Sequence, residues 1–288
     1  MAPWAPYEYS YVMPNFNTDN SVTRSELRQL YIRQALQHLI DEKAIIKDYY
    51  HGFALPSYGP VPVNSPYADR VDKTGVYGFN VAAARRLLET HGWSISSEGS
   101  HCVRPGRRRS ECGAGIAKGA KLAFHLSYYP GTAAVQLQDQ LIAADGAKVG
   151  ITITSTPLDS LFSNIVRCKA GTPACKWVLG EDGGWTPSAY PVDPALFGIS
   201  SSADVMSYNS AANVRNMNAA MYVDSPKGER AYQNYLAREL PLLWVPTPDM
   251  QVSAISTKLA HIGGQEPTLG ITPENWVLSP GSGGASSS

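Results

Sequence analysis

The stretch LAFHLSYYPGTAAVQLQDQLIAADGAKVGITIT, residues 122–154, decides the fold class. Its first part places apolar side chains at every second position, which is the spacing of a half-buried strand. From residue 132 to residue 144 the apolar spacing becomes helical, and Ile151 and Ile153 then begin a second strand. A strand, a helix and a strand within about 35 residues predict a crossover between parallel strands, and therefore an α/β lobe.

Helices are predicted before this unit. Residues 24–40 carry one apolar stripe at helical spacing, and Asp41 caps a second, short helix that ends near Gly52. The four prolines between residues 53 and 67 exclude a regular helix and predict an extended loop. A further helix is predicted from Asn80, its capping residue, to Gly92.

The sequence after this unit predicts a mixture of helices and strands. Thr156 and Pro157 have the cap and the first-turn proline of a helix start. A capped helix is expected to end at Leu240, and residues 242–245 and 252–255 are expected to form two late strands.

Charge and hydropathy exclude several classes of partner. The 24 basic and 24 acidic side chains cancel, so no overall field favours nucleic acid or an anionic membrane surface. No apolar run reaches the roughly 18 residues of a membrane-spanning helix. Residues 1–6 lack the basic flank and apolar core of a signal peptide. We therefore expect no nucleic-acid partner and no signal peptide in this chain.

The four cysteines form two local pairs, each within a loop-like sequence. Cys102 with Cys112, and Cys168 with Cys175, are too far apart in sequence for a zinc knuckle. Closing a short loop costs the least chain entropy, so we predict these two disulfides among the three possible connectivities. The alternative is four free thiols; disulfides would indicate an oxidising compartment.

Patterns that would indicate catalysis or a metal are absent or weak. The sequence has no Gly-x-Ser-x-Gly and no His-Glu-x-x-His, and no two of its six histidines stand four residues apart. Residues 113–119 are glycine-rich but precede a strand, which favours a connector over a phosphate loop. A basic cluster inside the proposed 102–112 loop favours a solvated loop tip over a nucleic-acid contact, and its members are Arg104, Arg107, Arg108 and Arg109. We expect no enzyme, cofactor or metal.

One loop has the composition of a ligand site. Between residues 183 and 197, Trp185, Tyr190 and Phe197 stand among glycines and prolines. Prolines stiffen such a loop, glycines admit a close ligand, and rigid aromatic rings bury an organic solute. The alternative is that these rings cap the hydrophobic core of a lobe, and their spacing does not separate the two interpretations.

Four segments, in order, resemble the family 5 solute-binding proteins of dipeptide and oligopeptide ABC importers. The closest match is YIRQALQHLID, residues 31–41, followed by HGFALPSYGPVP, residues 51–62. The segment YGFNVAAARRLLETHGW, residues 77–93, is similar to another helix of that family, and residues 136–154 resemble a helix leading into a strand. The paired cysteines and the ending Pro273–Trp276 resemble actinobacterial members, and the resemblance covers about residues 7–278.

The resemblance implies a periplasmic-binding-protein-like type II fold, in which two lobes close on a ligand. This chain matches the second α/β lobe, a mixed sheet flanked by helices, with the first lobe largely missing. The expected division is an entry strand and linker over residues 1–22, the second lobe over 23–240, a segment returning to the first lobe over 241–278, and a flexible Gly/Ser tail over 279–288. Strands of the returning segment would have open edges.

The resemblance also implies a function and a site. We expect a receptor that captures a peptide or other small organic solute for an ABC transporter permease, outside the cytoplasm, with membrane association only through a missing amino-terminal anchor. Trp185, Tyr190, Asp193 and Gly184 are the expected ligand-binding residues. Ser188 and Ala189 stand where peptide-binding relatives place an aspartate for the peptide amino terminus, which leaves other solutes open.

Two further functions are weighed against this receptor. A solute-binding lobe could serve as a protein–protein interaction module, docking through exposed strand edges near Trp244. A hydrolase ranks last, because the sequence has no catalytic pattern.

Overall fold

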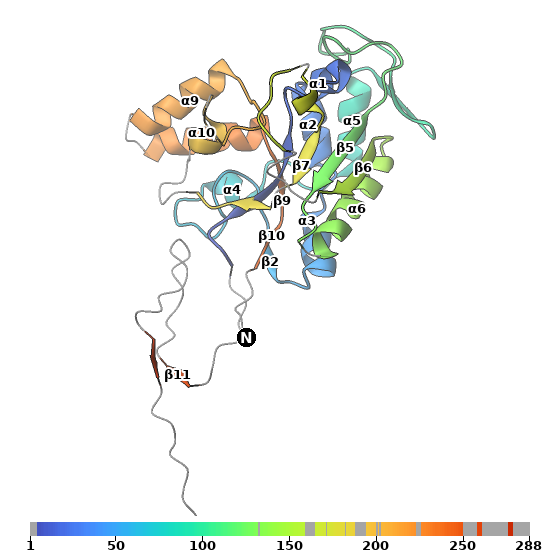
Figure 1. The fold of residues 1–288 in the computed structure, drawn as a ribbon. Coiled ribbons are helices and arrows are strands. Elements are labelled where there is room, and N and C mark those ends of the chain that lie inside the picture. Colours follow the sequence, from blue (N-terminus) through green and yellow to red (C-terminus); the bar gives the residue numbers. More distant parts are fainter. Residues whose placement is uncertain are drawn as a thin grey trace, which may run out of the picture.

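The structure, a computed structural model, describes residues 5–131, 133–158, 165–170, 172–181, 183–187, 194–199, 201, 203–222, 226–249, 258–260 and 276–278. These residues form an α/β lobe in which one mixed sheet runs through the middle (Figure 1). Its strands are hydrogen-bonded in the order β6-β5-β7-β1-β8, and β9 also pairs with β1. They are β1 (Tyr9–Pro14), β5 (Ala123–Tyr128), β6 (Thr152–Pro157), β7 (Leu179–Glu181), β8 (Gly184–Trp185) and β9 (Leu243–Val245).

The predicted crossover is confirmed. Strands β5 and β6 pair in parallel along their full lengths, from Ala123 opposite Thr152 to Tyr128 opposite Pro157, and α6 (Ala133–Ala147) connects them. Strand β7 is also parallel to β5. These three parallel strands set the direction of the sheet, and β1 runs antiparallel to β7.

Strands β7 and β8 follow one another along the same edge of β1. Gly180 lies opposite Met13, and Trp185 lies opposite Tyr9, so five residue steps on one side face four on the other. This extra residue is a β-bulge, which bends the strand and re-aims the side chains beyond it. Gly183 lies in the bulge with φ of 97°, a conformation that glycine adopts without steric cost.

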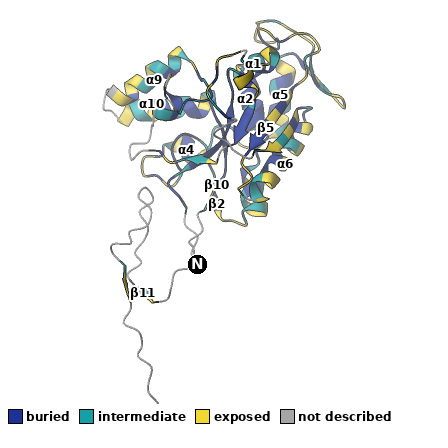
Figure 2. Cartoon of the chain, viewed as in Figure 1, coloured by how far each residue is buried: buried dark blue, intermediate teal, exposed yellow. Residues whose placement is uncertain are grey.

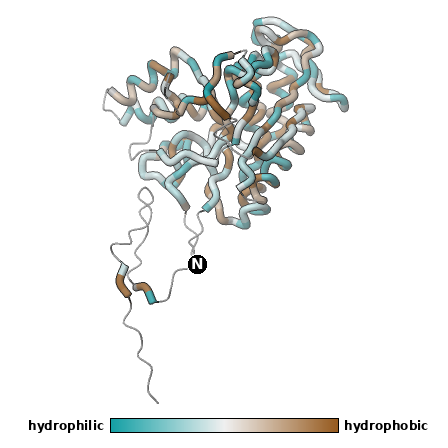
Figure 3. Tube along the Cα trace, viewed as in Figure 1, coloured by the Kyte–Doolittle hydropathy of each residue, from teal (hydrophilic) through white to brown (hydrophobic). Residues whose placement is uncertain are grey.

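Helices cover both faces of the sheet. On one face lie α2 (Leu30–Gln37), α5 (Val81–Thr90) and α6, and on the other lie α9 (Ala211–Tyr222) and α10 (Pro226–Glu239) (Figure 1). The central strands β1, β7 and β9 are buried, and the outward helix faces are exposed (Figure 2). Apolar stretches run through the middle of the lobe, while the outer helices have mixed hydropathy (Figure 3).

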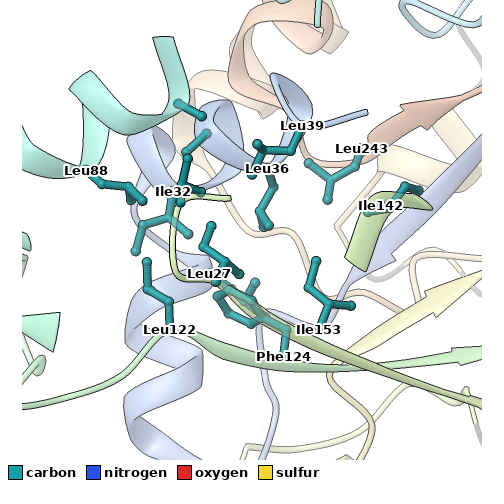
Figure 4. Close-up of a cluster of buried hydrophobic side chains, with 14 of the residues drawn as sticks. Leu27, Ile32, Leu36, Leu39, Leu88, Leu122, Phe124, Ile142, Ile153 and Leu243 are labelled. Atoms are coloured by element: carbon teal, nitrogen blue, oxygen red, sulfur yellow. The ribbon is translucent and has the colours of Figure 1, made fainter. Parts of the chain in front are cut away.

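Each face has its own hydrophobic core. The first core contains the buried side chains drawn in Figure 4, among them Ile32, Leu36, Leu88, Phe124, Ile153 and Leu243. The second contains Tyr9, Tyr11, Met13, Phe197, Tyr232, Leu236 and Trp244. Strand β1 contributes to both cores. Val12 packs in the first core, and Tyr9, Tyr11 and Met13 pack in the second, because successive side chains of a strand point to opposite faces.

The stripe predicted over residues 24–40 is two helices, α1 (Ser21–Leu27) and α2. The chain turns between them at Gln29, whose ψ of 118° is extended. The Arg33 guanidinium donates a hydrogen bond to the carbonyl of Leu27 at 2.6 Å, and this bond satisfies one of the carbonyls left unpaired at the end of α1. The short helix predicted from Asp41 is α3 (Glu42–Ala44), which continues as a π-helical turn over Ile45–Tyr49.

The outer edge of β9 is closed by a side chain. Gln37 accepts a hydrogen bond from the Trp244 N–H at 2.8 Å and donates one to the Trp244 carbonyl at 3.0 Å. Its amide thereby satisfies both backbone groups that a neighbouring strand would pair. The open edge expected near Trp244 is therefore wrong, and Trp244 itself is buried, edge-on to Tyr9 at 5.6 Å between ring centroids.

Both predicted disulfides are present. Cys102 is bonded to Cys112 and Cys168 to Cys175, and the structure has no free cysteine. The first closes a loop behind the hairpin of β3 (Trp93–Ser96) and β4 (Gly99–Cys102). The second lies beside the short helix η2 (Pro173–Cys175).

Smaller elements are also present in the described residues. Strand β2 (Ala54–Leu55) pairs with β10 (Thr247–Pro248), and β11 (Leu259–Ala260) pairs with β12 (Val277–Leu278). Short helices are α4 (Arg70–Thr74) and α8 (Pro194–Phe197).

Three expectations about the chain's organisation differ from the structure. Thr156 and Pro157 end strand β6 instead of opening a helix, because β6 is an edge strand, where a proline is tolerated. Strand β1 lies in the middle of the lobe although it falls within residues 1–22. Strand β9 pairs with it although it falls within residues 241–278, and β10 pairs with β2, so a returning segment would begin after β10. The strand expected over residues 252–255 lies outside the described residues.

Candidate functional site

The parallel strands end together at one edge of the sheet. Tyr128 of β5, Pro157 of β6 and Glu181 of β7 are neighbours there, and β8 follows directly after the bulge. We call this edge, with Tyr129 and Trp185, the carboxyl-end face. In open α/β sheets ligands bind outside the carboxyl ends of the strands.

Trp185 combines core packing with exposure. Its register partner is Tyr9, and its half-buried ring packs partly against the second core. Core packing, one of the two interpretations of the tryptophan loop, is therefore present in part, whereas a ligand-binding role for the accessible part of the ring stays a prediction. A ring held in this way is rigid and presents apolar surface at little entropic cost.

The two glycines of this segment have different surroundings. Gly183 is exposed, and a Cβ built on it would meet no atom within 4 Å. A Cβ on Gly184 would overlap the carboxylate of Glu8, so a larger residue at this position would require the Glu8 side chain to move. The structure thus places Glu8 beside Gly184, a neighbour that sequence reasoning missed because the two residues are far apart in the chain.

Tyr129 is a second residue of the face that the sequence analysis did not single out. Its side chain is 51 % exposed, and its backbone N–H donates to the carbonyl of Glu181 at 3.2 Å. The sequence signal that could have identified Tyr129 is an aromatic residue one position after the alternating apolar residues of the predicted strand. Tyr190 and Asp193 lie outside the described residues, so their placement stays a prediction.

A buried polar cluster lies behind the end of β7. The Gln138 amide of α6 donates to the Glu181 carboxylate at 2.7 Å, and the side chains of both residues are buried. The neighbouring Asp139 is also buried, which raises its pKa to about 6. Burial raises the pKa of Tyr50 as well, and the charges of Glu181 and Asp139 add to that effect. The cluster ties α6 to the strand end from which the glycine bulge begins.

Two cavities lie away from the carboxyl-end face. Cavities of about 940 Å³ and 580 Å³ are lined by other segments, and Trp185 lines neither. Among the described residues no group of three or more histidine, cysteine, aspartate or glutamate side chains is placed to hold a metal.

The basic cluster of the Cys102–Cys112 loop has a structural role in part. Arg104 donates to the carbonyls of Glu89 and Thr90 at 3.1 and 3.3 Å, at the end of α5. A cation at a helix carboxyl terminus is favoured by the unpaired carbonyls there. None of the helices in the described ranges is long and apolar enough to cross a membrane.

A mixed sheet between helical layers, with an open aromatic face at its strand ends, defines one lobe of a type II solute-binding fold. The chain belongs to the bacterial extracellular solute-binding proteins, family 5, whose middle-region model matches residues 4–218. In sequence it is similar to Protein XP55 of Streptomyces lividans, with 31 % identity over 123 residues. That match covers 42 % of this chain and 19 % of the relative.

Solved structures show the same fold. The oligopeptide-binding protein AppA of Bacillus subtilis, in complex with a nonapeptide, superposes with a TM-score of 0.73 at 17 % identity, over 95 % of this chain and 51 % of AppA. NikA of Staphylococcus aureus, in complex with Ni(L-His)₂, gives 0.68 at 16 % identity, over 95 % and 52 %. The chain therefore spans about half the length of these structures.

Proposed function

We propose that this chain forms one wall of a clamp that captures a small organic solute, of the peptide class, for an ABC importer. The observation that carries the proposal is the carboxyl-end face, where three parallel strands end beside Trp185 and Gly183. Family membership supports it, because family 5 proteins are extracellular solute-binding proteins. The opposite wall would be the other lobe of the fold.

The mechanism is closure without any bond made or broken. The solute would stabilise the closed state only through its higher affinity for that state. Trp185 would stack on the ligand, Tyr190 would help to enclose it, and Gly184 would allow close approach.

The charge that the ligand can carry depends on which carboxylates face it. Ser188 and Ala189 offer no carboxylate, and a buried ammonium without a partner is costly. We propose Asp193 for this role, and Glu8 supplies a second carboxylate at the same face, beside Gly184. AppA holds a nonapeptide and NikA a nickel–histidine complex, so both ligand types are reasonable probes.

The partners follow from the same proposal. The receptor would deliver its solute to a transporter permease outside the cytoplasm. The lobe would comprise residues 23–240 together with β1 and β9, and the returning segment would follow β10.

Calorimetry with a mixture of short peptides, and separately with nickel–histidine, tests the proposal. We expect weak binding, because about half of the contacts are absent while the entropic costs of association remain. Trp185→Ala should abolish it, and Phe79→Ala, which removes an exposed ring elsewhere, should not. Submicromolar binding by this chain alone, or unchanged binding by Trp185→Ala, would contradict the clamp.

An interaction module remains the second candidate, but Gln37 closes the edge at Trp244 through which docking was expected. Size-exclusion chromatography separates the two, since docking predicts a stable dimer or complex and solute capture predicts a monomer. Absence of turnover on peptide and ester substrates would dismiss the hydrolase.

A further inference from the structure

The larger cavity, of about 940 Å³, lies at the end of the sheet opposite the carboxyl-end face. It is reached by Phe16 and Asn17, which follow the last residue of β1, whereas Trp185 pairs with the first residue of that strand. At about 3.3 Å per residue the strand alone separates the two places by roughly 17 Å. The cavity is therefore no part of the proposed solute site.

Cations dominate the lining of this cavity. Arg28, Arg33, Arg167 and Lys169 line it, against the two acids Asp204 and Glu239. Within the described part of the chain no carboxylate lies within 4 Å of any of these four cations. Asp204 is buried and accepts a hydrogen bond from the Tyr208 backbone N–H at 3.2 Å, within its own loop.

Arg33 is a buried cation held in one orientation. Its side chain donates to the carbonyls of Leu27, Glu239 and Leu240 at 2.6, 2.8 and 2.9 Å, and its guanidinium lies 5.2 Å from the centroid of the Phe16 ring. Each terminal nitrogen donates one N–H to these carbonyls, which leaves one further N–H on each. Helix-end carbonyls compensate its charge only in part.

Arg28, which is exposed, also lines the cavity. It donates to the Phe16 carbonyl at 3.0 Å. Burial and the charge of nearby Arg24 both lower the pKa of Arg28. The charges of Arg24 and Arg28 thus repel each other, and among the described residues no carboxylate lies within 4 Å of Arg28, which favours a bound anion. At longer range Glu239 acts on Arg33 and Asp204 on Arg167.

The other two cations belong to a segment that is fixed on several sides. The Cys168–Cys175 disulfide lies between Arg167 and Lys169, and the Asn17 amide donates to the Cys168 carbonyl at 3.0 Å. The Trp177 indole donates to the Val166 carbonyl at 3.0 Å. Cationic side chains on a fixed segment lose less entropy when they bind a ligand.

We propose that this cavity binds a small oxyanion with at least two negative charges, such as a phosphate or a di- or tricarboxylate. Guanidinium groups suit such ligands because their paired N–H groups match two oxygens. Ser207, Ser210 and Asn209 add neutral hydrogen-bonding groups at the wall, and the volume leaves room for an organic portion.

Calorimetric titration with inorganic phosphate and with citrate, at constant ionic strength, tests the site. The expected result is saturable binding of one or both by the whole chain, weakened about tenfold or more in the double variant Arg28→Gln/Arg167→Gln. Both side chains are exposed, so the variant should fold, and circular dichroism checks this. Arg33 is left intact because it joins α1, α2 and α10.

The matched control removes two exposed arginines of the Cys102–Cys112 loop, Arg107→Gln/Arg109→Gln, which has the same change in net charge. It should bind both anions as the unmodified chain does. Equal weakening in the two variants would reduce the effect to net charge and overturn the site. Absence of saturable binding of either anion, or unchanged affinity in the cavity variant, would overturn it as well.

Discussion

A single side chain, that of Gln37, satisfies the backbone groups at the outer edge of β9. Replacing it with leucine keeps the approximate volume but leaves the Trp244 N–H and carbonyl buried without their partner. Unsatisfied buried polar groups cost about 1–3 kcal/mol each, so Gln37→Leu should lower the free energy of unfolding by a few kcal/mol. Urea denaturation measures this loss.

The control for that variant is Gln34→Leu, one turn earlier on α2. Gln34 is half-buried and donates to the Tyr77 hydroxyl at 2.8 Å, so a smaller loss is expected. Equal losses for the two variants would show that the double hydrogen bond to Trp244 has no special weight.

Gly184 and Glu8 give a second prediction, on the carboxyl-end face. Gly184→Ala would drive a methyl group into the Glu8 carboxylate and should destabilise the protein by about 1–3 kcal/mol. Glu8→Ala should relieve most of that cost in the double variant, because the overlapping atoms belong to that side chain. A double-mutant cycle of unfolding free energies measures the coupling. Additive effects would contradict the packing described for this pair.

The Cys102–Cys112 disulfide acts at the scale of an element, the hairpin β3–β4 and its loop. Cys102→Ala/Cys112→Ala should cost about 2–3 kcal/mol, since closing a loop of this length restricts the unfolded chain. The loop is also joined to α2, where the Tyr31 hydroxyl donates to the Cys112 carbonyl at 2.6 Å. Unfolding under oxidising conditions measures the change, because reducing conditions would also break the Cys168–Cys175 disulfide. An unchanged free energy of unfolding would contradict it.

Elements whose contacts are local were the ones that could be predicted from sequence. The β5-α6-β6 crossover is set by period and spacing, and the helix from Asn80 by a cap that accepts from the Ala83 N–H. The turn at Gln29 was missed because the apolar stripe over residues 24–40 continues through it without a break. The turn depends on Arg33, whose side chain caps the carboxyl ends of α1 and α10. Pairing of β1 with β9 joins segments more than 200 residues apart, and no local pattern encodes such a register.

The candidate site followed the same rule. Trp185 and Gly184 were singled out from the sequence because a loop's composition is local, whereas Glu8 and the cavity cations come from segments that meet only in the fold. The disulfides were predictable for the reason that each closes a short loop.

The whole molecule should be more stable in mild acid than in mild alkali. Burial raises the pKa of Glu26 and Asp72 to about 7, and of Asp139 and Asp204 to about 6. A raised folded-state pKa means that the native state binds more protons, so its contribution to stability is present below the unfolded pKa, near 4, and is lost as pH rises through 6 to 7.

Each unit of pKa difference corresponds to about 1.4 kcal/mol, so a loss of several kcal/mol is expected between pH 4 and pH 8. Urea denaturation across this range measures it, and Glu26→Gln should flatten the curve. Stability that stays constant or increases with pH over the same range would contradict the prediction.

The central claim, that a solute meets this lobe at the ends of its parallel strands, can be tested by NMR of the six tryptophan indoles. Trp185→Phe assigns the decisive signal, and Trp93, buried against Tyr31 on another side of the lobe, serves as the internal control. During titration with short peptides or nickel–histidine, we expect the Trp185 indole signal to move and the Trp93 signal to stay in place. A bound solute that leaves the Trp185 signal in place would contradict it.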